Sequence, residues 1–154
     1  MIRRVSAVFV AAALLSTGCS GQTPEAKQAA ADHLQRAAQE PGAVQTESGL
    51  VFRTLTPGTG AQPKATDMVR VHYHGTLPGG KIFDSSVDRG EPAEFGLNQV
   101  IPCWTEGVQR MHVGEKAELV CPAAIAYGDR GAGGVIPPGA TLIFEVELLA
   151  IKSR

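Results

Sequence analysis

Apolar side chains recur at every second position in several segments of this chain. Leu142, Phe144, Val146 and Leu148 show this period near the C-terminus, and residues 69–73 repeat it earlier. A period of two places alternate side chains on opposite faces of a strand, which is typical of a half-buried sheet. Eighteen glycines and ten prolines among 154 residues supply turns and favour a sheet over a helical bundle.

A second period marks one short helix. Trp104, Val108 and Met111 recur at i, i+4 and i+7 after Pro102, which places them on one helical face. The chain is long enough for one ordinary domain with short appendages. The sequence therefore predicts an α+β domain, an antiparallel sheet covered by one short helix.

The first residues have the pattern of an export signal. Arg3 and Arg4 form a positive segment, and residues 5–15 are uncharged and apolar. That run is too short to span a bilayer as a helix but suits the core of a signal peptide. We predict a signal peptide over residues 1–18 and a mature protein in the periplasm or cell envelope.

The end of this segment predicts a lipid anchor. Residues 14–19 read Leu-Leu-Ser-Thr-Gly-Cys and resemble a lipobox, in which the cysteine becomes the lipid-modified first residue. Cys19 is the predicted lipidation site, which would attach the protein to a membrane. Ordinary cleavage near Gly18 or Gly21, without lipid, is the alternative.

A tether and a helix are predicted for residues 19–43. Thr23 is a good N-cap with proline behind it, and residues 25–40 are mostly strong helix formers. Leu34 is the one large apolar residue in this helix, so we expect a spacer or a weak contact surface. The folded domain is expected to occupy residues 44–154.

The net charge and the cysteine content argue against two kinds of binding site, for nucleic acid and for metal. A formal charge of −1 provides no broad basic field, so nucleic acid is not an expected partner. In an oxidising compartment Cys103 and Cys121 could form one disulfide, or they could remain two buried thiols. Neither cysteine has a second cysteine or histidine at ligand spacing, and no metal site is expected.

Nucleophilic and phosphate-binding machinery is missing. The sequence has no Gly-x-Ser-x-Gly elbow, no glycine loop for phosphate and no His-Glu-x-x-His helix. His72 and His74 are predicted on the outward face of a strand, where histidines are usually solvated. We expect no cofactor, and an enzyme of this kind would act by shape and desolvation.

Six ordered segments resemble one family. They are residues 71–75 (VHYHG), 80–86 (GKIFDSS), 100–107 (VIPCWTEG), 126–128 (AYG), 136–138 (IPP) and 140–149 (ATLIFEVELL). Together they closely resemble the FKBP-type peptidyl-prolyl cis/trans isomerases, and most of all the exported bacterial branch. The resemblance covers about residues 44–151.

This resemblance implies a fold, a reaction and a site. The implied fold is a five- to six-stranded antiparallel sheet wrapped around the short helix, and the implied activity is isomerisation of X-Pro bonds in unfolded or proline-containing polypeptides. The resemblance also implies binding of tacrolimus or rapamycin. The implied catalytic residues are Phe83, Asp84, Trp104 and Tyr127. The implied substrate-binding residues are Tyr73, Val100, Ile101, Val135, Ile136 and Phe144.

Two departures and two alternatives accompany the resemblance. Ala93 stands where many relatives carry an aromatic residue, so the upper pocket is expected to be more open. Cys103 replaces the glycine that usually precedes the tryptophan. A non-catalytic chaperone or peptide-binding module could use the same pocket. A structural envelope lipoprotein is the other alternative.

Overall fold

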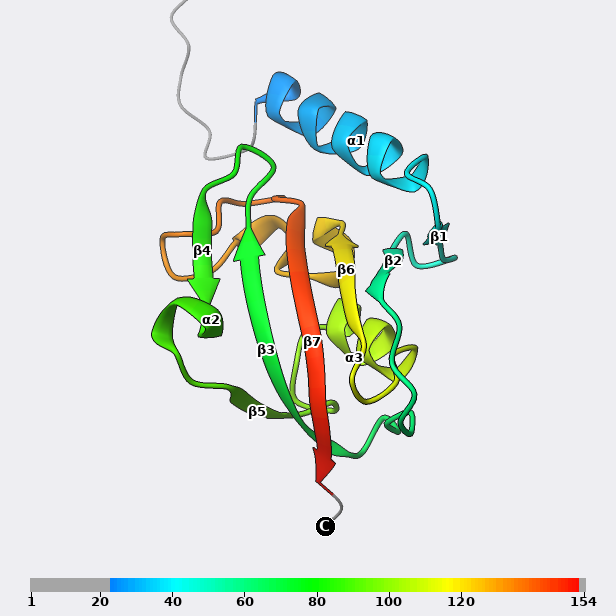
Figure 1. The fold of residues 1–154 in the computed structure, drawn as a ribbon. Coiled ribbons are helices and arrows are strands. Elements are labelled where there is room, and N and C mark those ends of the chain that lie inside the picture. Colours follow the sequence, from blue (N-terminus) through cyan, green and yellow to red (C-terminus); the bar gives the residue numbers. More distant parts are fainter. Residues whose placement is uncertain (1–22, 153–154) are drawn as a thin grey trace, which may run out of the picture.

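The computed structural model describes residues 23–152 (Figure 1). The predicted signal peptide, Cys19 and most of the tether lie outside the described residues. The elements in chain order are α1 (Pro24–Ala38), β1 (Ala43–Gln45), β2 (Val51–Thr56), β3 (Met68–Thr76), β4 (Ile82–Ser85), α2 (Ser86–Arg89), β5 (Ala93–Gly96), α3 (Pro102–Gln109), β6 (Lys116–Cys121), η1 (Ala123–Ile125), η2 (Gly128–Arg130) and β7 (Leu142–Lys152).

The strands of residues 23–152 form one antiparallel sheet of seven strands. Six follow the order β1-β2-β6-β7-β3-β4, and β5 also pairs with β3. The predicted fold class, an antiparallel sheet wrapped around one short helix, is confirmed. The strand number exceeds the expected five or six. The shortest strand, β1, has only three residues, too few to show a period in the sequence.

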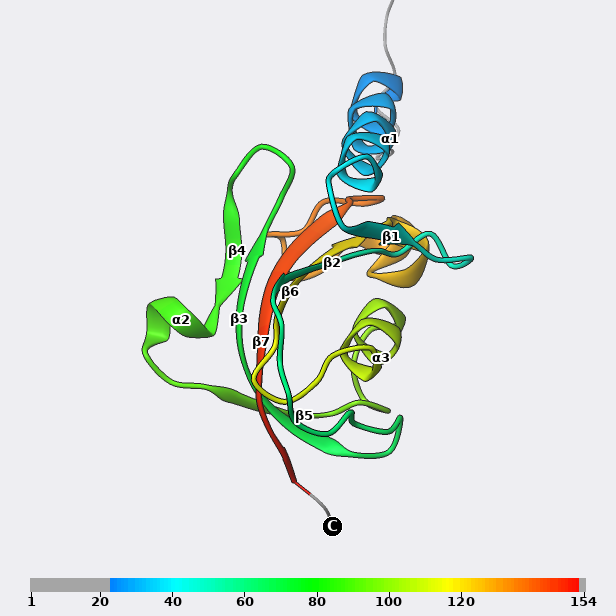
Figure 2. The ribbon, with the colours of Figure 1, turned by 45° about the vertical axis from the view of Figure 1, so that its right-hand side comes forward.

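The sheet has two faces that bury different partners. Phe52, Leu119 and Phe144 lie opposite one another across β2, β6 and β7; Leu119 and Phe144 belong to the main core, and the partly buried Phe52 packs against it. The sheet curves around α3 on this face (Figure 2). From α3, Trp104 and Val108 enter the same core at 4% and 0% exposure. The helical face predicted from the sequence is therefore the buried one.

The opposite face carries α1. The Thr23 side chain accepts a hydrogen bond from the Ala26 N–H, so the predicted N-cap is confirmed. Leu34 and Ala37 belong to a small second cluster. Their partners in the sheet are Val51, Val120 and Ile143. This contact is small, as the alanine-rich sequence predicted, and it explains why Val120 is buried although it points away from the main core.

An ion pair also joins the segment that follows α1 to the sheet. The Arg53 guanidinium lies 3.4 Å from a Glu40 oxygen, just beyond α1, and 3.0 Å from a Glu118 oxygen on β6.

No helix within residues 23–152 has both the length and the apolar content needed to cross a bilayer.

Candidate functional site

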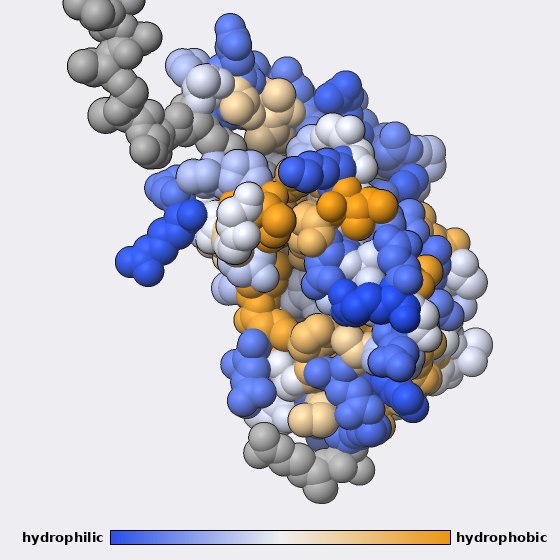
Figure 3. All heavy atoms as spheres, turned by 90° about the vertical axis from the view of Figure 1, so that its left-hand side faces the viewer, coloured by the Kyte–Doolittle hydropathy of each residue, from blue (hydrophilic) through white to orange (hydrophobic). Residues whose placement is uncertain are grey.

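A cavity of about 480 Å³ opens between the sheet and α3. Its volume suits a small ligand or a few amino-acid residues. On the side of the molecule that carries β4, apolar residues gather around a hollow among hydrophilic ones (Figure 3). The cavity is lined by Tyr73, Phe83, Asp84, Phe95, Gln99, Val100, Ile101, Trp104, Tyr127 and Phe144.

Trp104 forms the floor of this cavity, and three aromatic rings surround it. The rings of Tyr73, Phe95 and Phe144 each meet the indole edge to face, with centroids 5.3, 5.5 and 5.3 Å away. Such pairs contribute about 0.5–1.5 kcal/mol each beyond the burial of their area. The Trp104 Nε1 atom is buried and has no hydrogen-bond partner in the described chain. Within the described chain the indole is therefore held by ring packing and not by a hydrogen bond from Nε1.

Close packing at Gly75 shapes the cavity wall. Gly75 lies on β3 opposite Phe144 of β7 and Asp84 of β4. A Cβ atom at Gly75 would come within 2.6 Å of the Phe83 ring and 3.1 Å of the Phe144 ring. Because this side chain is missing, the two rings can pack edge to face at 5.4 Å.

A polar cluster stands at the rim. The Tyr73 hydroxyl donates to Asp84 Oδ2 at 2.5 Å. Arg89 of α2 donates from Nη1 to Asp84 Oδ1 at 2.5 Å and from Nη2 to the Tyr73 hydroxyl at 3.0 Å. Charge-assisted hydrogen bonds of this kind are stronger than neutral ones. The cluster holds the Asp84 carboxylate in one orientation at the cavity edge.

These contacts set the ionisation of the cluster. Burial opposes ionisation of Asp84, but hydrogen bonds from Tyr73 and Arg89 and the Arg89 charge together hold the Asp84 pKa below its ordinary value. Burial, followed by the hydrogen bond to Asp84, raises the pKa of Tyr73. Asp84 is therefore an acceptor and Tyr73 a donor across the neutral pH range.

Eight of the ten residues implied by the resemblance line the cavity. Val135 and Ile136 do not belong to that lining. Val135 is 44% exposed, whereas Ile136 is 6% exposed and packs into the core. Their loop is closed by hydrogen bonds between Ala132 and Ile136, 3.0 Å in both directions. Backbone pairing of this loop turns the Ile136 side chain inward.

Three residues of the site, Phe95, Gln99 and Arg89, are not among those predicted from the sequence. Phe95 and Gln99 line the cavity, and Arg89 fixes the rim from outside the lining. A signal for Phe95 existed, since it stands two residues after Ala93 and therefore on the same side of β5. The ring of Phe95 meets both Tyr73 and Trp104, so the region around Ala93 is not empty of aromatic groups.

The two histidines of β3 have serine partners. His72 Nδ1 lies 3.1 Å from the Ser86 hydroxyl, and His74 Nδ1 lies 2.9 Å from the Ser85 hydroxyl. Within residues 23–152 no three His, Cys, Asp or Glu side chains gather in a way that could hold a metal ion.

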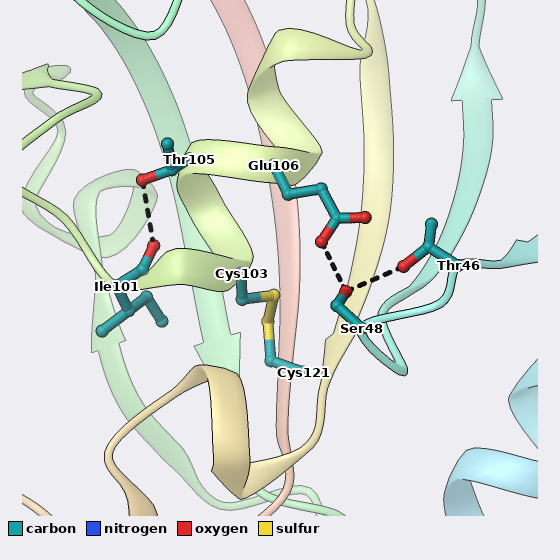
Figure 4. Close-up of a disulfide and its surroundings, with 7 residues drawn as sticks. All are labelled: Thr46, Ser48, Ile101, Cys103, Thr105, Glu106 and Cys121. Atoms are coloured by element: carbon teal, nitrogen blue, oxygen red, sulfur yellow. Dashed lines mark hydrogen bonds between the residues drawn. A yellow bond between two sulfur atoms is a disulfide. The ribbon is translucent and has the colours of Figure 1, made fainter.

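Cys103 and Cys121 form a disulfide in the structure, with their Cα atoms 5.8 Å apart (Figure 4). Of the two arrangements that the sequence left open, the structure has the bridge. Cys103 directly precedes Trp104 on α3, and Cys121 ends β6. The bond therefore lies beside the cavity floor.

Comparison with known proteins identifies the family. The family model described as FKBP-type peptidyl-prolyl cis-trans isomerase matches residues 59–149. The chain is 59% identical over 121 residues to the FKBP-type peptidyl-prolyl cis-trans isomerase FkpA of Aeromonas hydrophila, which covers 79% of this chain and 45% of the relative. The chain spans about half the length of several curated bacterial relatives that it matches.

In two further comparisons the alignment covers nearly the whole length of the matched protein. FK506-binding protein 1 of Candida glabrata is 52% identical over 109 residues, covering 69% of this chain and 96% of that protein. The crystal structure of a peptidyl-prolyl cis-trans isomerase from Pseudomonas syringae is 40% identical and superposes with a TM-score of 0.80. It covers 88% of this chain and 100% of that chain. The chain belongs to the FKBP-type peptidyl-prolyl cis-trans isomerase family.

Proposed function

We propose that this protein catalyses cis/trans isomerisation of X-Pro peptide bonds in polypeptide clients. The observation that carries this proposal is the apolar cavity floored by Trp104, with Asp84 and Tyr127 among its lining. The barrier to amide rotation, about 18–20 kcal/mol, comes from resonance that makes the planar amide dipolar. A twisted amide is less dipolar, so an apolar cavity stabilises it relative to the planar ground state.

Each residue has a role in this proposal. Trp104 lies under the proline ring, and Tyr73, Phe83, Val100 and Phe144 form the walls. The Tyr127 hydroxyl and the Ile101 N–H donate to carbonyl groups of the client. Asp84 supplies a fixed carboxylate at the rim. Val135 and Ile136 belong to the loop that borders the client chain. The role of Tyr127 is supported by its place in the lining and by its 41% exposure.

The direct test measures exchange in a short X-Pro peptide. We expect the protein to accelerate cis/trans exchange, and we expect tacrolimus to suppress this acceleration by filling the cavity. Circular dichroism of the same sample establishes that the protein is folded. A folded sample that leaves the exchange rate at its uncatalysed value would rule the proposal out.

Tyr127→Phe is expected to lower kcat/KM about two- to tenfold, because one hydrogen bond contributes about 0.5–1.5 kcal/mol. The measurement is peptide exchange, and the control is the unchanged unfolding temperature expected for an exposed side chain. Suppression of client aggregation is measured in parallel. If wild type suppresses aggregation but does not catalyse exchange, the protein is a binding module and not an isomerase.

The catalytic rate is expected to be independent of pH between about pH 5 and pH 9. No histidine belongs to the cavity lining. The pKa of Asp84 lies below its ordinary value of 3.8. Ionised Asp84 therefore stabilises the folded protein fully above pH 3.8, and this stabilisation is lost as the pH falls through the lowered pKa. The Tyr73 pKa is above 10.0, so its contribution is complete below pH 10 and is lost above it. A kcat/KM profile with a midpoint near pH 6.5 would contradict this account.

We propose further that the protein is exported and anchored to a membrane of the cell envelope. The signal peptide of residues 1–18 and lipid on Cys19 are supported by the pattern of the first 19 residues. Mass measurement of the mature N-terminus is expected to find Cys19 as the first residue with lipid attached. A mature protein whose first residue is not a lipid-modified cysteine would contradict the proposed anchor.

The proposed isomerase unit spans residues 44–154, preceded by the tether and helix of residues 19–43. The limited contact of α1 with the sheet supports this boundary, since only Leu34 and a few alanines pack there. Removal of residues 19–42 is expected to leave kcat/KM within about twofold of the full mature chain, because α1 lies on the sheet face opposite the cavity.

A further inference from the structure

The helix that carries the cavity floor is short and depends on outside contacts. α3 has eight residues, its N-cap is Ile101, and no side chain caps its N-terminus. Helices of this length are not stable alone, because nucleation costs more than so few hydrogen bonds return. The position of Trp104 is therefore set by what holds α3 to the rest of the fold.

One of these contacts is the Cys103–Cys121 disulfide. Both cysteines are 0% exposed, and Cys103 occupies the second position of the helix, directly before Trp104. Cys121 is the last residue of β6, and the chain continues through η1 to Tyr127. The disulfide thus links the start of α3, which supplies the floor, to the segment that supplies Tyr127 of the lining (Figure 4).

The other contacts of α3 are not covalent: Trp104 itself packs on three rings, and further contacts lie along the helix. A Cβ atom at Gly107 would come within 2.8 Å of the Leu119 side chain, which shows how closely α3 lies on β6. Ser48 donates to Glu106 Oε2 at 2.5 Å, and Thr105 Oγ1 donates to the Leu97 carbonyl at 2.6 Å. The disulfide is the covalent bond that fixes the N-terminal end of α3, and this end of the helix borders the cavity.

We propose that the Cys103–Cys121 disulfide is a positioning element of the isomerase site. It holds Trp104 and Tyr127 at a fixed separation, so that both residues engage one proline-containing segment together. The disulfide touches no client; it acts through these two residues. Fixed geometry of this kind raises a rate because less ordering is needed in each turnover. This inference rests on the proposed isomerase function.

The test begins with the bond itself. Peptide mapping of protein alkylated without reductant is expected to find Cys103 and Cys121 joined, and two alkylated cysteines there would overturn the proposal. The double variant Cys103→Ala/Cys121→Val then removes the bond and leaves small apolar side chains in its place. We expect it to fold and to show kcat/KM reduced about three- to tenfold.

Fluorescence gives a second readout that a purely stabilising bond would not change. Trp104 is the only tryptophan in the chain, so its emission reports on the cavity floor alone. It is 4% exposed. In the double variant, under conditions where circular dichroism shows full folding, we expect increased quenching of Trp104 by acrylamide. If wild type shows no exchange activity, the proposed function fails, and the fluorescence measurement still decides whether the bond positions the floor.

Val51→Ala is the matched control for lost stability. Val51 is 2% exposed and packs under α1 on the face opposite the cavity. Its variant is expected to unfold at a lower temperature with unchanged kcat/KM and unchanged quenching of Trp104. The proposal is overturned if the double variant matches wild type in both kcat/KM and quenching. It is equally overturned if Val51→Ala reproduces both changes.

Discussion

Trp104→Ala is expected to reduce kcat/KM for X-Pro exchange about a hundredfold and to lower the free energy of unfolding by about 3–5 kcal/mol. The indole forms the cavity floor and meets three other rings edge to face. Its removal leaves a void among Tyr73, Phe95 and Phe144 and takes away the surface under the proline ring. Peptide exchange and denaturant unfolding measure the two effects.

Trp104→Phe separates activity from folding. Because Trp104 Nε1 has no hydrogen-bond partner in the described chain, phenylalanine removes no protein hydrogen bond and keeps an aromatic floor. We expect this variant to remain folded and to keep more activity than Trp104→Ala. Full activity in a folded Trp104→Ala protein would show that the client does not bind on the indole.

Gly75→Ala is expected to reduce kcat/KM roughly tenfold and to destabilise the protein by about 1–3 kcal/mol. The new methyl group would lie 2.6 Å from the nearest Phe83 ring atom, so that ring must move. Phe83 and Phe144 are both cavity walls, and their displacement changes the shape that the client meets. Kinetics and unfolding are measured on the same samples.

Gly79→Ala is the control for this substitution. A Cβ atom at Gly79 has no neighbouring atom within 4 Å, and Gly79 does not have a positive φ. The same change of residue there is expected to stabilise slightly, by about 0.4–1 kcal/mol at most, and to leave kcat/KM unchanged. Equal effects of the two substitutions would mean that the loss at Gly75 does not arise from the packing of Phe83 and Phe144.

The rim cluster of Tyr73, Asp84 and Arg89 contains one residue, Arg89, that the sequence does not predict. The motif predicts Asp84. Arg89 stands five residues later on another element, and nothing in the sequence indicates that its side chain contacts Asp84. The short helix α2 and its left-handed Gly90 cap place Arg89 beside Asp84 and Tyr73. Convergence of this kind depends on the angle between β4 and α2, which no local period encodes.

The disulfide and the packing of α1 depended on the tertiary structure in the same way. Cys103 and Cys121 are 18 residues apart in sequence, and only the close approach of α3 to β6 brings their Cα atoms within bridging distance. The sequence shows Leu34 as the one large apolar residue of α1 but does not indicate its partners. Its partners Val51, Val120 and Ile143 become neighbours only through the register of three strands.

The alternation of apolar residues by itself determined which side chains of the strands are buried. A period of two requires side chains on two faces, so Leu142, Phe144, Val146 and Leu148 are all buried by 96% or more, as the pattern predicts. The pattern could not distinguish a cavity wall from packed core. Phe144 borders the cavity while Val146, two residues later, does not. That difference was decided by the tertiary structure, because it depends on whether a side chain from another element fills the space opposite.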